Sequence, residues 1–304
     1  MNAFSTLQTQ GFLAQGHRFA DVEGLRIGYR DHGTGPVLVM LHGWPLNGDT
    51  FAPLVDALAA RFRCIVPDLP GAGVSRWSTR HDLSPVGQAR LLQGLLATLG
   101  IEAYSLLGND SGGIIARYLA HWGATQVDKL ILLNTEIPGH RAPNQRLYKQ
   151  LARWLPGYNA IARIQLKNAD YLCSKLSFGG TLYDHQHLLG SFNQRFIAPL
   201  TRSALAMDEA RRSFIAVLDW SQLDALNAIH GTISAQTLLI WGRQDDTFPE
   251  ARAIEMSRGF GNFAGFISVD KARLYVHEDQ SEQVTQHLRA FLDNGPPDHG
   301  NAAA

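Results

Sequence analysis

The sequence predicts an α/β fold in which helices cover both faces of a mostly parallel β-sheet. Two observations lead to this prediction. Short, continuous apolar runs, such as residues 37–41 and 237–241, are typical of strands that are buried on both faces. Between these runs, apolar residues recur at helical spacing, so strands and helices alternate along the chain. This alternation favours parallel strands that are joined by crossover helices.

The composition is that of an ordinary globular protein. Hydrophobic residues make up 45% and charged residues 18% of the 304 positions, and the net charge at pH 7 is zero. A balanced charge favours neither nucleic acid nor an anionic membrane, so we expect neither as a partner. The two cysteines, Cys64 and Cys173, have no histidines at metal-ligand spacing, and we expect no disulfide framework, no metal and no other cofactor.

No stretch of the sequence has the features of a targeting or membrane segment. The first residues lack a basic start followed by an apolar core, and no apolar run approaches the ~20 residues of a membrane span. We therefore expect a soluble, cytoplasmic protein. The sequence leaves open whether it is a monomer or a homodimer.

The first half of the chain contains the expected strands and helices in regular order. A hairpin is expected within residues 22–29, because Glu23-Gly24 is a turn sequence between two alternating segments. Apolar runs predict further strands at residues 37–41, 64–66, 104–107 and 130–133. Apolar residues that share one face predict helices at residues 50–60, 92–99 and 115–122.

Residues 136–229 break this rhythm. They contain no strand-like run, and their apolar residues recur at helical spacing. Beyond them, the sequence predicts two more strands and a closing helix, at residues 237–241, 263–269 and 281–291. We therefore predict a discontinuous core domain and a helical insertion, with the core at residues 1–135 and 230–304 and the insertion at residues 136–229.

A candidate nucleophile lies in residues 108–112, which read Gly-Asn-Asp-Ser-Gly and follow an expected strand. The form Gly-x-nucleophile-x-Gly allows a sharp strand-to-helix turn, because its small residues let neighbouring backbones approach. Such a turn raises Asp110 above the sheet edge and leaves the N–H of Ser111 free to stabilise an oxyanion. In a second register Ser111 is the nucleophile, but Asn109 then stands where a small residue is needed. A plain glycine-rich turn with Asp110 as a helix N-cap is the remaining alternative.

This motif resembles the nucleophile elbow of the α/β-hydrolase fold, in the branch with an aspartate nucleophile that includes epoxide hydrolases and haloalkane dehalogenases. Residues 42–45, His-Gly-Trp-Pro, follow the strand at residues 37–41. In the family pattern, the residue after His-Gly supplies the second oxyanion N–H, which gives Trp44 this role. The resemblance also implies that the helical insertion is a cap over the active site. We expect an apolar pocket between core and cap, with Asp110 at its floor and Trp44 in its wall.

The resemblance implies an acid after one of the late strands. Residues 241–249 read Trp-Gly-x-x-Asp-x-x-Phe-Pro and match the acid-bearing loop of the family, which assigns Asp245 as the acid. Glu136 is the alternative acid, because it follows the strand at residues 130–133, where some dehalogenase-like relatives carry theirs.

The base is the point at which this sequence departs from the family. The usual Gly-His after the last strand aligns with Arg273-Leu274, and leucine cannot accept a proton. The nearest histidine is His277, three residues later. We expect His277 to be the base, within hydrogen-bond range of Asp245 or Glu136.

The chemistry that the resemblance implies is hydrolysis through an alkyl ester on Asp110. A small apolar organic substrate is expected, and an epoxide hydrolase is the most similar enzyme. Haloalkane dehalogenases usually carry Trp after the nucleophile and Asn after His-Gly as halide donors, whereas this chain has Ser111 and Trp44 there. Epoxide hydrolases use two cap tyrosines as proton donors. The candidates in the predicted cap are Tyr148, Tyr158, Tyr171 and Tyr183.

Three alternatives remain open. Without a working base, the chain is a ligand-binding homologue that does not turn over. A haloalkane dehalogenase-like activity is the second alternative, and a serine esterase that uses Ser111 is the third.

Overall fold

The carboxyl ends of a central β-sheet carry the site. The computed structural model describes residues 11–78 and 80–293. Eight strands form one sheet in the order β1-β2-β4-β3-β5-β6-β7-β8. Their bounds are β1 Arg18–Val22, β2 Leu25–His32, β3 Val37–Leu41, β4 Arg63–Pro67, β5 Tyr104–Asn109, β6 Val127–Leu133, β7 Gln236–Gly242 and β8 Phe263–Val269. The pairings β1–β2 and β2–β4 are antiparallel and all others are parallel, which confirms the predicted fold class.

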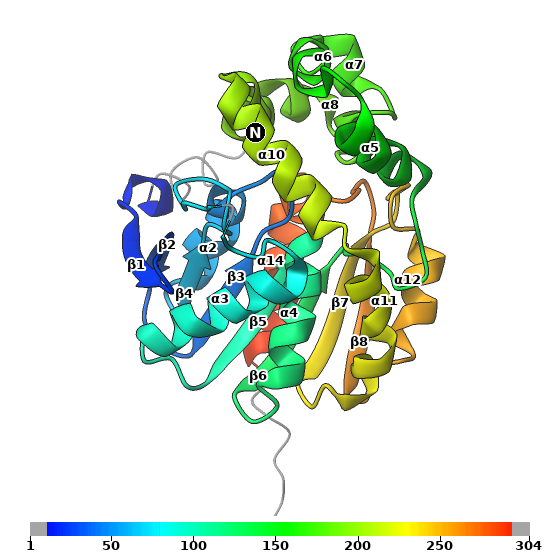
Figure 1. Cartoon of the computed structure of the whole chain (residues 1–304). Coiled ribbons are helices and arrows are strands. Elements are labelled where there is room, and N and C mark those ends of the chain that lie inside the picture. The colour runs from blue at the N-terminus through cyan, green and yellow to red at the C-terminus, as the bar shows by residue number, and fades with distance from the viewer. Residues whose placement is uncertain (1–10, 79, 294–304) are drawn as a thin grey trace, which may run out of the picture.

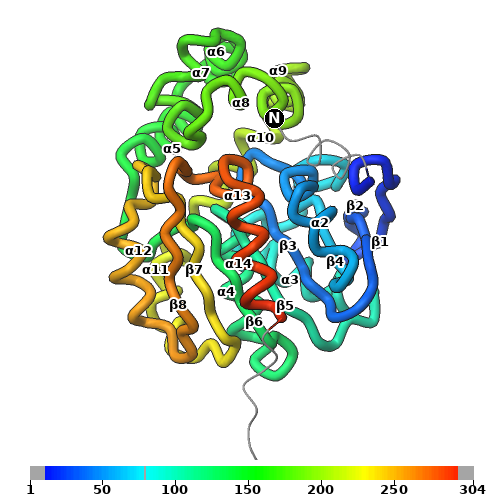
Figure 2. Tube along the Cα trace, turned by 180° about the vertical axis from the view of Figure 1, so that it is seen from behind, coloured from blue at the N-terminus to red at the C-terminus, as the bar shows by residue number. Residues whose placement is uncertain are grey.

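Helices cover both faces of this sheet. On one face lie α3 (Pro85–Thr98), α4 (Ser111–Trp122) and α11 (Trp220–Ile229), which are in front in Figure 1. The other face carries α2 (Ala52–Leu58) and α14 (Ser281–Asp293), which Figure 2 shows from behind. The remaining elements of the core are η1 (Gly48–Phe51), η4 (His230–Thr232), α12 (Glu250–Ser257) and α13 (Val276–Asp279).

Two separate hydrophobic cores follow from the alternation of side chains along each strand. In β3, Leu38 and Met40 belong to the core beneath α2 and α14, whereas Val39 and Leu41 belong to the core beneath α3 and α4. All four side chains are buried, and burial of an aliphatic side chain of this size contributes about 1.5–3 kcal/mol. The central strands therefore read as continuous apolar runs because both of their faces are covered.

The segment between β6 and β7 contains helices and loops but no strand. Residues 134–235, all of which the structure describes, contain no strand. Above the carboxyl edge of the sheet lie α5 (Pro143–Trp154), α6 (Tyr158–Gln165), α7 (Ala169–Cys173), η2 (Phe178–Gly180), α8 (His185–His187), η3 (Leu188–Ile197), α9 (Ala198–Thr201) and α10 (Ala204–Val217) (Figure 1). The next helix, α11, packs against α4 at the side of the sheet. The division into domains at residues 136 and 229 stays a prediction.

None of the helices in the described part of the chain has both the length and the apolar character that crossing a bilayer requires.

Candidate active site

The turn between β5 and α4 has a strained backbone with Asp110 at its centre. Asp110 adopts φ 49° and ψ −133°, a conformation that residues with a side chain rarely take and that costs on the order of 1–3 kcal/mol. The turn is also crowded, because a Cβ atom on Gly112 would lie 2.2 Å from the carbonyl oxygen of Leu41. The positive φ belongs to Asp110 and Ser111 begins the helix, so the geometry is that of an elbow that presents Asp110.

Two backbone N–H groups hold the Asp110 carboxylate. The N–H of Trp44 donates to Asp110 Oδ2 at 2.9 Å, and the N–H of Ser111 donates to the same carboxylate. Gly43 permits this approach, because a Cβ atom there would lie 2.4 Å from Asp110 Cβ. The N–H of Trp44 also lies 3.2 Å from Ser111 Oγ, but Ser111 does not line the cavity that Asp110 faces. This arrangement has the form of an oxyanion hole built from Trp44 and Ser111.

Asp110 and Glu136 share a cavity of about 160 Å³ beneath the helices of the insertion. Trp44 lines its wall, as expected, and most of the other lining side chains are apolar. Among them are Leu166, Leu176, Phe178, Met207, Phe214 and Val217. The predicted apolar pocket with Asp110 and Trp44 in its lining is therefore confirmed.

Three of the four candidate tyrosines line this cavity, namely Tyr148, Tyr158 and Tyr171. The hydroxyl groups of Tyr148 and Tyr171 are hydrogen-bonded at 2.9 Å. Burial and this bond raise the pKa of Tyr171 above its usual range, so its hydroxyl is protonated at neutral pH. Tyr183 lies outside the lining and is exposed.

Asp245 lies in the loop after β7 and accepts three hydrogen bonds from the chain. Its Oδ2 accepts from Asn134 Nδ2 at 2.8 Å, and its Oδ1 accepts from the N–H groups of Thr247 at 2.8 Å and Phe248 at 3.1 Å. Burial raises the pKa of Asp245 to about 7, and the nearby charge of Asp110 adds to the rise. The loop has the expected form, but none of the histidines that the structure describes is bonded to Asp245.

Glu136 is the second carboxyl group that lines the cavity. Its Oε2 lies 3.2 Å from Thr135 Oγ1, which also lies 2.8 Å from the carbonyl oxygen of Asp110. The Thr135 hydroxyl has one proton and two acceptors within reach, the carbonyl oxygen of Asp110 and Oε2 of Glu136. Burial, and then the charge of Asp110, raise the pKa of Glu136 well above its usual range.

Burial also raises the pKa of the Asp110 carboxyl to about 6, against the opposing effect of the N–H groups that donate to it from Ser111 and Trp44. Burial thus favours the protonated form of both carboxyls, and the charge of Asp110 favours it further on Glu136.

The structure contradicts the expected position of His277. Its Nε2 lies 2.8 Å from Thr50 Oγ1, and its Nδ1 has no partner among the described residues. Since the proton of Thr50 goes to Glu278 Oε1 at 2.7 Å, Nε2 is the donor to Thr50. The prediction that His277 is hydrogen-bonded to Asp245 or Glu136 is therefore wrong.

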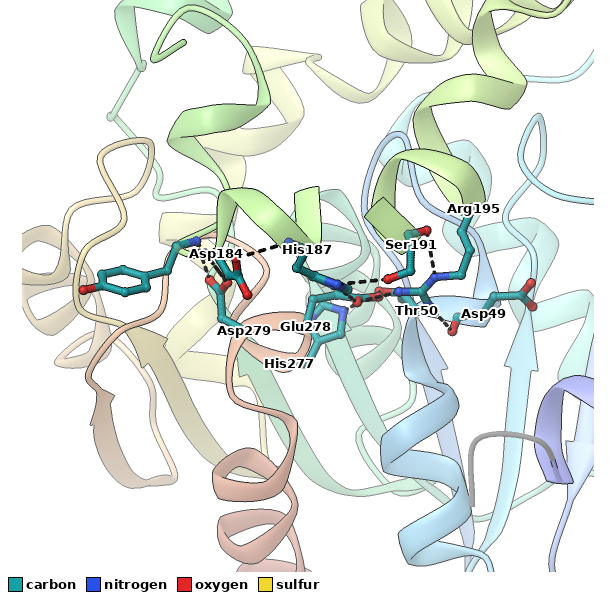
Figure 3. Close-up of polar contacts among 10 residues, drawn as sticks. Asp49, Thr50, Asp184, His187, Ser191, Arg195, His277, Glu278 and Asp279 are labelled. Carbon is teal, nitrogen blue, oxygen red and sulfur yellow. Dashed lines mark hydrogen bonds and ion pairs between the residues drawn. The ribbon is translucent and has the colours of Figure 1, made fainter. Parts of the chain in front are cut away.

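Packing explains this outcome. His277 stands in the short helix α13, which packs against η1, and its ring contacts Phe51 with centroids 5.1 Å apart. Figure 3 shows the imidazole beside the polar cluster around Glu278, which accepts from Arg195 Nη2 at 2.7 Å. Burial lowers the pKa of His277 to about 4, so it is neutral at physiological pH. His277 belongs to a buried contact between core and insertion, and it does not line the cavity.

Leu274 stands where the family carries its histidine. It is buried and lines the cavity with Asp110, and its carbonyl oxygen accepts from Asn109 Nδ2 at 3.0 Å. The next residue, Tyr275, also lines the cavity and donates its hydroxyl proton to the carbonyl oxygen of Trp44 at 2.8 Å. Sequence reasoning did not identify Tyr275, since a single buried tyrosine has no local motif.

Neither halide donors nor metal ligands are evident in the site. The indole Nε1 of Trp44 donates to the carbonyl oxygen of Ala210 at 3.0 Å, so this N–H is not directed at a ligand. Within residues 11–78 and 80–293, no cluster of three His, Cys, Asp or Glu side chains could hold a metal ion.

Comparisons with known proteins agree with this geometry. The family model of the alpha/beta hydrolase fold matches residues 36–279. The magnesium-chelatase 30 kDa subunit of Rhodobacter capsulatus is 34% identical over 259 residues, which are 85% of this chain and 87% of that protein. Haloalkane dehalogenase 2 of Mycobacterium tuberculosis (strain ATCC 25618 / H37Rv) is 25% identical over 268 residues, which are 88% of this chain and 91% of that protein.

Among solved structures, the epoxide hydrolase CorEH without ligand is similar to this chain, with a TM-score of 0.74 and 20% sequence identity. The match covers 91% of this chain and 98% of the CorEH chain. This likeness supports the fold. Because the family model extends from the start of β3 to beyond Leu274, the chain belongs to the α/β-hydrolase family and is an α/β-fold hydrolase.

Proposed function

We propose that this hydrolase acts on small apolar epoxides through an alkyl ester on Asp110. The observation that supports it best is the hydrogen bond from the N–H of Trp44 to Asp110 Oδ2 at 2.9 Å. This bond fixes one oxygen and leaves the other for attack on a carbon atom in the apolar cavity. After attack, the fixed oxygen is the carbonyl oxygen of the ester and already lies in the oxyanion hole.

In the first step, Asp110 Oδ1 bonds to an epoxide carbon and the carbon–oxygen bond of the ring breaks. The leaving oxygen takes a proton from the Tyr148–Tyr171 pair, whose hydroxyls share one hydrogen bond in the cavity. The products are a neutral hydroxy ester on Asp110 and a tyrosinate.

In the second step, Glu136 takes the place of the missing histidine. Alkylation removes the charge of Asp110, which is one cause of the raised pKa of Glu136, so Glu136 gives its proton to the tyrosinate. The Glu136 carboxylate then accepts a proton from water, and the hydroxide attacks the ester carbonyl. The acyl–oxygen bond breaks, the diol leaves with one proton, and Asp110 is again a carboxylate beside a protonated Glu136.

Isotope labelling tests this sequence directly. The protein is mixed with less than one equivalent of styrene oxide in ¹⁸O-water, and the peptide that contains Asp110 is analysed by mass spectrometry. Attack of water on the ester carbonyl places ¹⁸O in Asp110, whereas Asp110→Asn, assayed before it can deamidate, should form neither ester nor labelled peptide. An adduct found only on Ser111, or diol formation with no label in Asp110, would overturn the proposal.

The second candidate is a ligand-binding protein that forms the ester but does not release it. Leu274 favours this candidate, because it occupies the place of the base in an otherwise complete elbow. The two candidates differ in one observable quantity, the lifetime of the adduct. An adduct that persists in the wild-type protein without diol formation supports the binding protein.

A further inference from the structure

Helix α6 is unusual because none of its residues is buried, although half of them are apolar. One side of the helix lines the cavity through Tyr158, Ala162 and Gln165. On another side, Ile161 and Ile164 are 43% and 73% exposed. A surface helix normally turns its apolar side to the core and its polar side to water. Here α6 is a single layer between the cavity and an exposed apolar surface.

The exposed surface continues on the preceding helix and turn. Trp154 at the end of α5 is 70% exposed, Leu155 after it is 39% exposed, and Leu147 is 50% exposed. Leu147 and Trp154 are seven residues apart, which is two helical turns, so they lie on one side of α5. We call these residues the cap-tip patch: Leu147, Trp154, Leu155, Ile161 and Ile164. Figures 1 and 2 both show α6 at the outer end of the molecule, away from the sheet.

The segment that carries the cap-tip patch is basic. Residues 143–177 contain six Lys and Arg residues and one acidic residue, Asp170. Arg146, Arg153 and Lys167 are exposed, and the Arg153 guanidinium lies 5.2 Å from the ring centroid of Trp154. The net charge of zero for the whole chain therefore conceals a local excess of positive charge, and this excess is complementary to an anionic surface.

We propose that the cap-tip patch docks on the surface of an anionic lipid bilayer. An exposed tryptophan and aliphatic side chains, flanked by Lys and Arg, form the pattern of a helix that lies in the headgroup region. Docking brings α6 between the lipid and the cavity, so that only one helix separates an apolar substrate in the bilayer from the site. The inference departs from the expectation of no membrane partner, which used the whole-chain charge alone. It does not depend on the proposed reaction.

Flotation of the full-length protein with lipid vesicles tests the proposal without any substrate. We expect the protein to float with vesicles of phosphatidylcholine that contain about one quarter phosphatidylglycerol, less with phosphatidylcholine alone, and less at high salt. The double variant Trp154→Ser/Ile164→Ser should reduce the bound fraction about tenfold. A matched control is Ile254→Ser/Phe263→Ser, which removes two side chains that are 39% and 40% exposed on α12 and β8.

A second measurement distinguishes the other occupants of the patch. Thermal unfolding and circular dichroism establish that each variant is folded. Absence of flotation, or equal flotation of the Trp154/Ile164 variant and the wild type, would overturn the proposal. Light scattering that shows a dimer in the wild type and a monomer in this variant would also overturn it, and would assign the patch to a second copy of the chain.

Discussion

The backbone N–H of Trp44 donates to Oδ2 of Asp110 across 2.9 Å, although the two residues stand 66 positions apart in the chain. The two residues lie close together because β3 and β5 are parallel neighbours in the sheet, with Leu41 opposite Gly108. The loop after β3 and the elbow after β5 therefore emerge at the same edge. In the proposed mechanism, this hydrogen bond of the resting site becomes, in the ester, the bond that stabilises the negative oxygen of the tetrahedral intermediate.

The pH dependence of ester formation provides the first prediction. In the proposed reaction only the carboxylate form of Asp110 attacks, and burial raises the pKa of Asp110 to about 6. We expect the rate of adduct formation with styrene oxide to rise about tenfold per pH unit below this value and to level off above it. Intact-protein mass spectrometry in a series of buffers measures this rate. A rate that is constant across the acidic range would contradict the assignment of Asp110.

The second prediction concerns Glu136→Gln. Glutamine has nearly the same size but cannot accept a proton from water, so release of the ester should slow by about 10²–10⁴-fold. Ester formation should persist, because Asp110 and its N–H donors are unchanged. Single-turnover kinetics followed by intact mass separates the two steps. Equal release rates in the variant and the wild type would show that Glu136 is not the base, while leaving the role of Asp110 intact.

A matched control for Glu136→Gln is Asp245→Asn, which neutralises a second buried carboxyl near Asp110. Asp245 lies outside the cavity lining and accepts three hydrogen bonds from the chain. Its substitution should therefore affect stability more than ester release. The contrast between the two variants distinguishes a group in contact with water in the cavity from a group that fixes the loop after β7.

The third prediction concerns His277→Gln. We expect this substitution to change the stability of the fold but not the rates of ester formation and release. The ring of His277 is directed to Thr50, so both ester formation and ester release should equal those of the wild type. Its pKa is lowered from 6.5 to about 4 by burial, so the unfolded chain binds a proton that the folded chain excludes. Stability of the wild type is therefore lost as the pH falls from about 6.5 to about 4.

The His277→Gln variant has no imidazole to take up a proton on unfolding, so it lacks this part of the stability loss at acidic pH. The difference in unfolding free energy between wild type and His277→Gln should be largest at neutral pH and should shrink on acidification. Denaturant unfolding at several pH values measures it. Slow ester release in the folded variant would restore His277 as a candidate base.

Local patterns in the sequence predicted the strands and the elbow because both depend on nearest neighbours. The run at residues 37–41 is apolar because both faces of β3 are covered, and Gly112 is needed because Leu41 leaves no space for a Cβ atom. The position of His277 could not be obtained in this way. Only the packing of α13 on η1 turns its ring toward Thr50, and η1 lies more than two hundred residues earlier in the chain.

The surroundings of Glu136 also could not be predicted from the local sequence. The sequence places it after β6, where an acid of some relatives stands, and its partner was expected to be a histidine. Its access to the cavity and its contact with Thr135 depend on how the chain leaves β6 and enters the insertion. The pairing of Tyr148 with Tyr171 likewise depends on the approach of α5 and α7, which no local motif encodes.

The last prediction is a gain of function at Leu274. This side chain lines the cavity with Asp110, at the position where the family carries its base. Leu274→His should place an imidazole there and accelerate ester release by about 10²-fold or more. Asp245 can orient the new ring, because its two oxygens offer about four acceptor sites and three donors use them now. A polar ring in an apolar position should also lower the unfolding free energy, by about 1–3 kcal/mol.

The control is Leu274→Asn, which is polar but cannot serve as a base, and which should lose stability without faster release. Intact-protein mass after a pulse of styrene oxide gives the lifetime of the adduct in all three proteins. A shorter lifetime only in Leu274→His shows that the elbow and the acid loop are competent and that the leucine limits turnover. Equal lifetimes in folded Leu274→His and wild type would mean that the imidazole does not reach the ester, so the loop after β8 would then differ from that of the family by more than one side chain.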